Sequence, residues 1–372
     1  MENAAGRSPL LRHITLFAPA VLVAGAAWGL YVFAGGTPVF RAVALALVIG
    51  IITFTLRPVG TIPAVFGGLI LAICPAFWAQ TGGEGVYPLA LYAAALVGVA
   101  LLGAVVYWVT RSPAWTIGLV GAALMSAALV GQVIVVGGAR SLRLTTIAAA
   151  LIVYLLADML RVSNPRPDSG LTPEQPRPER PLYLLGAFTF GVVNDPTIAL
   201  FSPAIILGLL LARVKLSPLV WIAFGVAILF GAGRLIDVYI DANYWAFSAE
   251  RAVREGLQAP VLIGDAWREA WAWFGLFRFL GDQFPPVGVV LGVIGLARLS
   301  RWYPPLGIVT LTIFGMYALF GLLYFGGDSA VLLIPLLMIQ VLWITYALAA
   351  LRDWLVKMTG VRGEWRGVRN TL

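Results

Sequence analysis

Long apolar runs, separated by short polar segments, fill most of the chain between residues 14 and 351. A helix that crosses a membrane needs about 20 consecutive apolar residues, and the longer runs reach that length. The pattern therefore predicts an all-α integral membrane protein with about twelve transmembrane helices. We expect these helices at residues 14–34, 40–56, 61–79, 87–109, 114–136, 144–160, 182–193, 196–212, 217–236, 286–300, 304–325 and 330–351.

The apolar stretch 182–212 is predicted to form two short helices, because it contains the tripeptide Asn194-Asp195-Pro196. Proline cannot donate a helix hydrogen bond, and it disfavours helical geometry at the residue before it. We therefore expect the chain to turn at this tripeptide and to return across the membrane.

Polar segments divide the chain into groups of helices. Residues 161–181 are rich in proline and charge, a composition that cannot bury a core and is typical of a solvated loop. The expected organisation is a cytoplasmic stub (1–13), a first helix group (14–160), the proline-rich cytoplasmic loop (161–181), a second helix group (182–236), an extracytoplasmic and interfacial segment (237–285), a third helix group (286–351) and a basic cytoplasmic tail (352–372).

Composition excludes several classes of protein. Hydrophobic residues make up 60% of the chain and charged residues 11%, whereas soluble domains carry about 25% charged residues. These figures argue against a soluble enzyme, a disordered chain and a nucleic-acid partner. With one cysteine, Cys74, and one histidine, His13, the chain can form neither an internal disulfide nor a Cys/His metal site. Catalysis would have to use carboxylates, arginines, hydroxyls or backbone groups, and no organic cofactor is expected.

The distribution of Lys and Arg predicts how the helices cross the membrane. With both termini in the cytoplasm, 17 of the 25 Lys and Arg residues lie on the inner side of a bacterial plasma membrane, in agreement with the positive-inside rule. This orientation places Glu84, Asp195, Asp237, Asp241 and Asp328 at or just beyond the outer face. Because the chain carries so few charges, these carboxylates are candidates for a site. The alternative is that they are solvated loop residues.

Aromatic residues recur at helical spacing within 237–285, at Trp267, Trp271, Phe274 and Phe277. This pattern predicts an amphipathic helix that lies in the membrane interface. Its aromatic face either anchors a long loop or roofs a lipid-facing cavity.

Asp237 and Asp241 lie four residues apart, and therefore on one face if their helix continues. Carboxylate oxygens suit Mg²⁺ or Mn²⁺, so a divalent cation could bind there. The alternative is a solvated helix end that Arg234 caps.

Three stretches carry polar residues in a characteristic order. The first is Ala76-Phe77-Trp78-Ala79-Gln80, followed by Glu84 and Tyr87. The second runs from Leu185 through Asn194-Asp195-Pro196-Thr197 to Pro203, and the third contains Tyr324, Asp328 and Pro335. In their order and in their expected place on the outer face, these stretches resemble motifs of GT-C class membrane glycosyltransferases, in the bacterial branch related to protein O-mannosyltransferases.

The resemblance implies a GT-C-like fold and transfer of a sugar from a polyprenyl-phosphate donor on the extracytoplasmic side. A carboxylate would take the proton of the acceptor while the lipid phosphate leaves, and arginines would hold that phosphate. On this basis the expected catalytic residues are Glu84, Asp195 and Asp328, and the expected substrate-binding residues are Trp78, Tyr87, Arg234 and Arg268.

The chain departs from the family pattern at two places. Asp195 stands where the family usually has histidine, and the first outer loop, residues 35–40, contains no carboxylate. Either the catalytic acid comes from elsewhere, from Glu84 or Asp195, or the chain is a degenerate relative without activity.

Two other functions remain open. A non-catalytic scaffold or assembly subunit would use the many small residues of the helices for close packing with partner subunits. A transporter would use the helix that is broken at Asp195, since discontinuous helices form ion and substrate sites.

Overall fold

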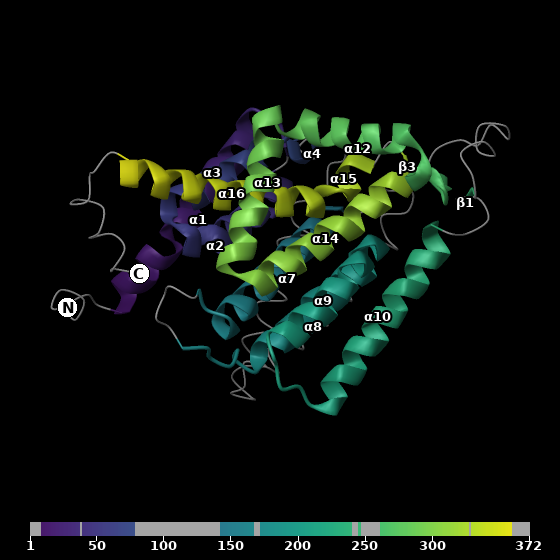
Figure 1. The fold of residues 1–372 in the computed structure, drawn as a ribbon, viewed down its shortest axis with the longest axis horizontal. Helices are drawn as coiled ribbons and strands as arrows, with labels where there is room; N and C mark the ends of the chain where they lie inside the picture. The colour runs from purple at the N-terminus through teal and green to yellow at the C-terminus, as the bar shows by residue number, and fades with distance from the viewer. Residues whose placement is uncertain are drawn as a thin grey trace.

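The computed structural model describes residues 9–37, 39–78, 142–166, 172–239, 245–246, 261–326 and 329–358, most of which are helical (Figure 1). Six helices in these ranges are long and apolar enough to cross a membrane, or up to seven if a bent pair counts as one span. The six belong to α1 (Pro9–Phe33), α2 (Val39–Leu56), α7 (Leu142–Ser163), α10 (Pro218–Tyr239), α14 (Pro304–Leu323) and α16 (Ile334–Met358). The predicted helical membrane protein is confirmed in this coarse form, whereas the count of twelve spans stays a prediction.

The remaining helices are shorter, and they also follow the predicted apolar runs. They are η1 (Arg57–Val59), α3 (Thr61–Ile73), α4 (Pro75–Trp78), α8 (Glu179–Asn194), η4 (Pro196–Phe201), α9 (Ser202–Leu211), η5 (Ala266–Arg268), α12 (Ala270–Gln283), α13 (Pro286–Trp302) and α15 (Ser329–Leu332). The spans expected at 87–109 and 114–136 lie outside the described residues.

Proline occupies the first position of α4, η4, α10, α13 and α14. A proline is tolerated there because the first helical N–H has no partner within the helix. The same chemistry corrects one prediction: the expected single helix over 61–79 is divided, because Pro75 follows Cys74, whose backbone is extended. The first predicted helix also begins earlier than expected, at Pro9.

The core of the bundle surrounds α16. In the candidate membrane span of α16, 83% of the residues are buried, compared with 17% in that of α10. Helix α16 packs against α3, α13 and α14. Two glycines of α13 allow the closest of these approaches: a Cβ at Gly292 would overlap the side chain of Gln340, and one at Gly295 would overlap the Trp343 carbonyl group. Small residues at helix interfaces allow backbones to approach closely in membrane proteins.

One end of the bundle gathers the ends of α2, α7 and α16 with the beginning of α1. The ring of Phe17 stacks on Phe54 at 5.1 Å. Arg161 donates hydrogen bonds to the Thr55 carbonyl oxygen (2.6 Å) and the Tyr346 hydroxyl (3.0 Å). We call this the arginine end, after Arg57, Arg161, Arg298 and Arg352. The positive-inside rule assigned these four residues to one side, and the structure places them at one end of the bundle.

The opposite end, which we call the sheet end, carries three short strands, β1 (Trp245–Ala246), β2 (Val261–Ile263) and β3 (Tyr324–Phe325). Strand β2 pairs with β1 in parallel and with β3 in antiparallel orientation. Figure 1 shows β1 and β3 on the right, whereas the beginning of α1 and the end of α16 lie on the left. These strands total seven residues, so the described part of the chain remains almost entirely helical, as the all-α prediction expects.

Candidate functional site

The predicted turn at Asn194-Asp195-Pro196 is present, and it joins α8 to η4. Asp195 has extended backbone angles (φ −146°, ψ 127°), as expected for a residue before proline. Helix α9 then returns toward the arginine end, where the Asn164 side chain donates a hydrogen bond to the Leu211 carbonyl oxygen (3.2 Å). The two-helix interpretation of 182–212 is therefore confirmed.

The length of α8 sets the depth of this turn. Its 16 residues extend about 24 Å, since an α-helix rises about 1.5 Å per residue. The hydrocarbon core of a bilayer is about 30 Å thick. Because α8 begins at the arginine end, Asp195 lies toward the sheet end, and α8 is shorter than the thickness of the hydrocarbon core.

The Asp195 side chain is fully buried (0% exposed). Its Oδ1 accepts hydrogen bonds from the backbone N–H of Thr197 (2.8 Å) and from the Thr197 hydroxyl (2.6 Å). Oδ1 therefore caps the first turn of η4. The second oxygen, Oδ2, is buried and accepts no hydrogen bond from the described residues. An unsatisfied buried polar atom costs about 1–3 kcal/mol, so this oxygen is an unusual feature of the turn.

Three neighbouring helices hold the turn in place. Arg234 of α10 donates through Nη1 to the carbonyl oxygens of Val192 (2.9 Å) and Val193 (2.5 Å) at the end of α8. From α14, the buried Tyr317 hydroxyl donates to the Thr197 carbonyl oxygen (3.0 Å). From α7, Thr145 accepts a hydrogen bond from the Asn194 side chain. Arg234 is well placed for this role, because the C-terminal end of a helix attracts cations.

Close packing at the turn depends on two glycines. A Cβ at Gly191 would lie 2.9 Å from the Ile198 side chain, and a Cβ at Gly231 would lie 3.1 Å from both Ala199 and Val192. Both contacts are tighter than ordinary van der Waals distances. The absence of a side chain at these positions lets η4 and α10 approach α8.

An aromatic helix lies at the same end of the bundle. Helices α12 and α13 meet at an angle of 101°, and Figure 1 shows α12 along the upper edge, near α4 and β3. Ala272, Leu276 and Leu280 are buried at four-residue spacing, whereas Trp271, Phe274 and Phe277 are exposed. A helix with an exposed aromatic face is thus present, although it begins at Ala270 and leaves Trp267 in η5, and its position in the membrane interface stays a prediction.

Four of the predicted site residues other than Asp195 lie in the described ranges. Arg234 contacts the Asp195 turn, as described above. Asp237 is exposed one turn further along α10. Arg268 is exposed in η5 and lies over the Trp267 ring at 5.0 Å. Trp78 packs on Tyr31, with ring centroids 5.9 Å apart.

The other predicted site residues, Glu84, Tyr87, Asp241 and Asp328, lie outside the described residues. The proposed cation pair therefore has only Asp237 in the described ranges. Within those ranges, no group of three or more His, Cys, Asp or Glu side chains is placed to hold a metal ion.

Sequence patterns did not indicate the hydroxyl-bearing partners of the turn, Thr145, Thr197 and Tyr317. Thr197 follows the proline of the motif and could have been predicted as the partner of an Asp cap. Tyr317 and Thr145 approach from distant helices, and local spacing carries no signal for such contacts.

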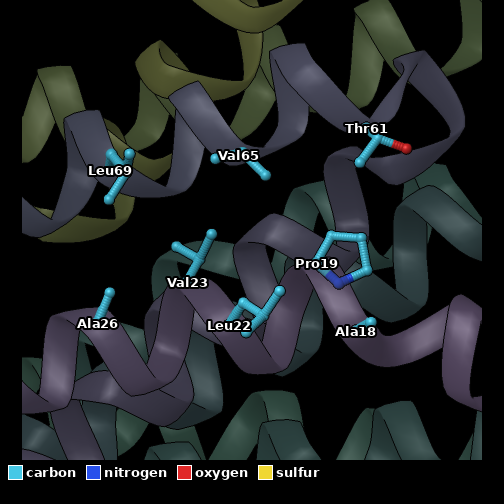
Figure 2. A pocket seen from close by; sticks show the side chains of 8 residues that line it. All are labelled: Ala18, Pro19, Leu22, Val23, Ala26, Thr61, Val65 and Leu69. Carbon is cyan, nitrogen blue, oxygen red and sulfur yellow. The ribbon is translucent and has the colours of Figure 1, made fainter.

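A shallow, open groove lies between α1 and α3 (Figure 2) and has a volume of about 350 Å³. Its lining residues are Ala18, Pro19, Leu22, Val23, Ala26, Thr61, Val65 and Leu69. Because none of them is ionisable, this groove suits an acyl chain and not the catalytic step.

The single cysteine provides a test of the packing beside α12. Cys74 is 1% exposed, its thiol donates to the Gln283 side-chain oxygen (3.1 Å), and that oxygen also accepts from the Ala76 N–H (2.6 Å). We expect a water-soluble maleimide to label the folded protein in detergent at pH 7.5 at least about tenfold more slowly than the unfolded protein, because reactivity requires access. Intact mass spectrometry measures the labelling. Equal labelling rates for the folded and the unfolded protein would contradict this packing.

Comparisons of the chain with protein families, with curated proteins and with solved structures found no match.

Proposed function

We propose that the protein binds a polyprenyl-phosphate-linked sugar at the sheet end of the bundle and transfers the sugar on the extracytoplasmic side. One observation carries the proposal: the broken helix brings a buried carboxylate and a half-buried arginine to one turn, at the end of the bundle where the aromatic helix α12 lies. The resemblance to GT-C glycosyltransferases supplies the class of donor.

Arg234 is the phosphate-binding residue in this proposal. Its Nη1 holds two carbonyl oxygens of α8, whereas Nε and Nη2 form no hydrogen bond with the described residues. A guanidinium with two nitrogens that make no hydrogen bond to the described residues suits a phosphate oxygen, because such charge-assisted bonds are strong and directional. The exposed aromatic side chains of α12 suit the headgroup region, where the lipid phosphate lies.

Asp195 acts as a positioning residue and not as the general base, which revises its expected role. A base must reach the acceptor hydroxyl, and Asp195 is fully buried with Oδ1 committed to Thr197. The proposal therefore assigns proton removal to Glu84 or Asp328. The acceptor oxygen attacks the anomeric carbon, the bond from that carbon to the phosphate oxygen breaks, the phosphate leaves with the electron pair, and the carboxylate takes the proton.

The variant Arg234→Gln tests the proposal. We expect native mass spectrometry of the gently extracted wild-type protein to show a bound polyprenyl phosphate, and we expect at least about tenfold less of it on Arg234→Gln. Arg234→Lys keeps the charge and the contact with α8, so it should retain part of the lipid. Arg278→Gln is the matched control, because Arg278 is exposed on α12 and pairs there with Asp282.

The result that would overturn the proposal is a wild-type protein without such a lipid. If stoichiometric partner subunits accompany that protein, the scaffold function replaces the transferase function. Equal amounts of bound polyprenyl phosphate on the wild type and on Arg234→Gln would show that Arg234 does not bind the phosphate.

A transporter is the second candidate, and the unsatisfied Oδ2 of Asp195 favours it. Carboxylates buried within membrane helices often bind protons or cations, and broken helices build such sites. Cation-dependent uptake into proteoliposomes, abolished by Asp195→Asn, would support this candidate over the transferase.

A further inference from the structure

The arginine end carries a second constellation, which the proposed function does not use. Trp302 is the last residue of α13 and is 8% exposed. The guanidinium carbons of Arg166 and Arg298 lie 4.2 and 4.3 Å from the centroid of its ring. At this distance both cations interact favourably with the ring, yet they bring two like charges to one aromatic residue.

A third arginine joins this group through an aromatic contact. Arg161 donates to the Tyr346 hydroxyl (3.0 Å), and the Tyr346 ring lies 6.0 Å from that of Trp302. Arg161, Arg166 and Arg298 come from the end of α7, the segment after it and α13, and all three are half-buried. We call Arg161, Arg166, Arg298 and Trp302 the Trp302 cluster.

Two carboxylates near this end pair with other arginines. Asp158 pairs with Arg180 (3.1 Å) and Asp353 with Arg352 (2.8 Å). Arg161 and Arg298 form no ion pair with any carboxylate of the described residues. The positive-inside rule explains why cations lie at this end. Fully solvated arginines would satisfy that rule equally well, whereas these three arginines are half-buried beside aromatic rings.

An apolar stripe leads from this cluster toward the middle of α13. Val290, Ile294 and Arg298 are spaced by four residues and share one face of the helix. Val290 is 57% and Ile294 49% exposed. A molecule with a phosphate at Arg298 could therefore lay a hydrocarbon chain along α13.

We propose that the Trp302 cluster binds the phosphate of an anionic glycerophospholipid in the membrane leaflet at the arginine end. The phosphate accepts hydrogen bonds from Arg298 and its neighbours and reduces the repulsion between the guanidinium groups, while an acyl chain covers the exposed stripe of α13. Basic pockets between transmembrane helices at the cytoplasmic side commonly bind such headgroups.

The test compares the melting temperature of the protein in nanodiscs of phosphatidylcholine with that in nanodiscs that also contain phosphatidylglycerol. Anionic lipid should raise the melting temperature of the wild type and should remain bound in native mass spectra. In Arg298→Gln we expect the bound phosphatidylglycerol to fall about fivefold and the rise to be lost, with little change in pure phosphatidylcholine. Arg298→Lys should retain part of both signals, and Arg278→Gln at the sheet end should retain all.

Several results would overturn the proposal. One is equal binding of phosphatidylglycerol by the wild type and Arg298→Gln. Another is equal loss in Arg278→Gln, since that would show a general charge effect. A third is the same stabilisation by 10 mM inorganic phosphate or glycerol phosphate, which would identify a site for the free anion. A fourth is an acidic partner protein that remains bound after extraction and excludes the lipid. If Arg298→Gln fails to fold, Arg298→Lys replaces it in the test. Phosphatidylglycerol binding by Arg298→Lys equal to that of the wild type would then overturn the proposal.

Discussion

Replacing Gly295 with valine should lower the melting temperature of the detergent-solubilised protein by about 6–12 °C. A Cβ at this position would overlap the backbone carbonyl group of Trp343, and no side-chain rotation can relieve a contact with backbone. Helix α13 must therefore move away from α16, the most buried of the membrane helices. Such overpacking costs about 3 kcal/mol, and each kcal/mol lowers the melting temperature of a large domain by about 2–4 °C.

Gly225→Val in α10 is the matched control for this prediction. Nothing lies within 4 Å of a Cβ placed at Gly225, so the valine meets open space. Tryptophan fluorescence, recorded during heating, measures the melting temperature of both variants. Equal melting temperatures for Gly295→Val and Gly225→Val would contradict the close contact between α13 and α16.

Two substitutions at Asp195 should differ clearly in their effect on stability. Asp195→Asn keeps an oxygen that can accept the two hydrogen bonds from Thr197, so we expect a melting temperature close to that of the wild type. Asp195→Leu removes the cap of η4 and leaves the Thr197 N–H and hydroxyl without their acceptor. The expected loss is about 2–3 kcal/mol of unfolding free energy, measured as a lower melting temperature.

The variant Asp195→Asn also separates the two proposed functions. If Asp195 only positions the turn, Asp195→Asn should bind polyprenyl phosphate within about twofold of the wild type, because binding then depends on geometry. If a proton or cation binds at Oδ2, Asp195→Asn should fold normally and abolish uptake. A large fall in the stability of Asp195→Asn would contradict the capping role itself.

The hydrophobic pattern predicted most of the described helices. Because apolar runs and prolines are local signals, the bounds of α2, α13 and α14 fall within a few residues of those expected. The strands were missed for a physical reason: Leu262 pairs with Trp245 and with Tyr324, which lie far away in sequence. Two-residue and three-residue strands leave no alternating pattern.

The candidate site was predicted in part. Asp195 followed from the proline motif, and its position at a turn between two short helices is as expected. Arg234 was selected for its charge, but its contact with the α8 carbonyl oxygens depends on the packing of α8 against α10, for which Gly231 leaves room. Burial of Asp195 could not be predicted, since it results from Tyr317 and neighbouring side chains on three other helices.

The proposed polyprenyl-phosphate site lies at the sheet end, and the proposed glycerophospholipid site lies at the arginine end. A photoreactive polyprenyl phosphate, activated on the protein in nanodiscs that contain phosphatidylglycerol, tests this placement most directly. We expect saturable crosslinks on the last turns of α10 and on α12, at least about tenfold reduced in Arg234→Gln and unchanged in Arg278→Gln. Crosslinks confined to the arginine end, or crosslinks that do not saturate at either end, would contradict the account.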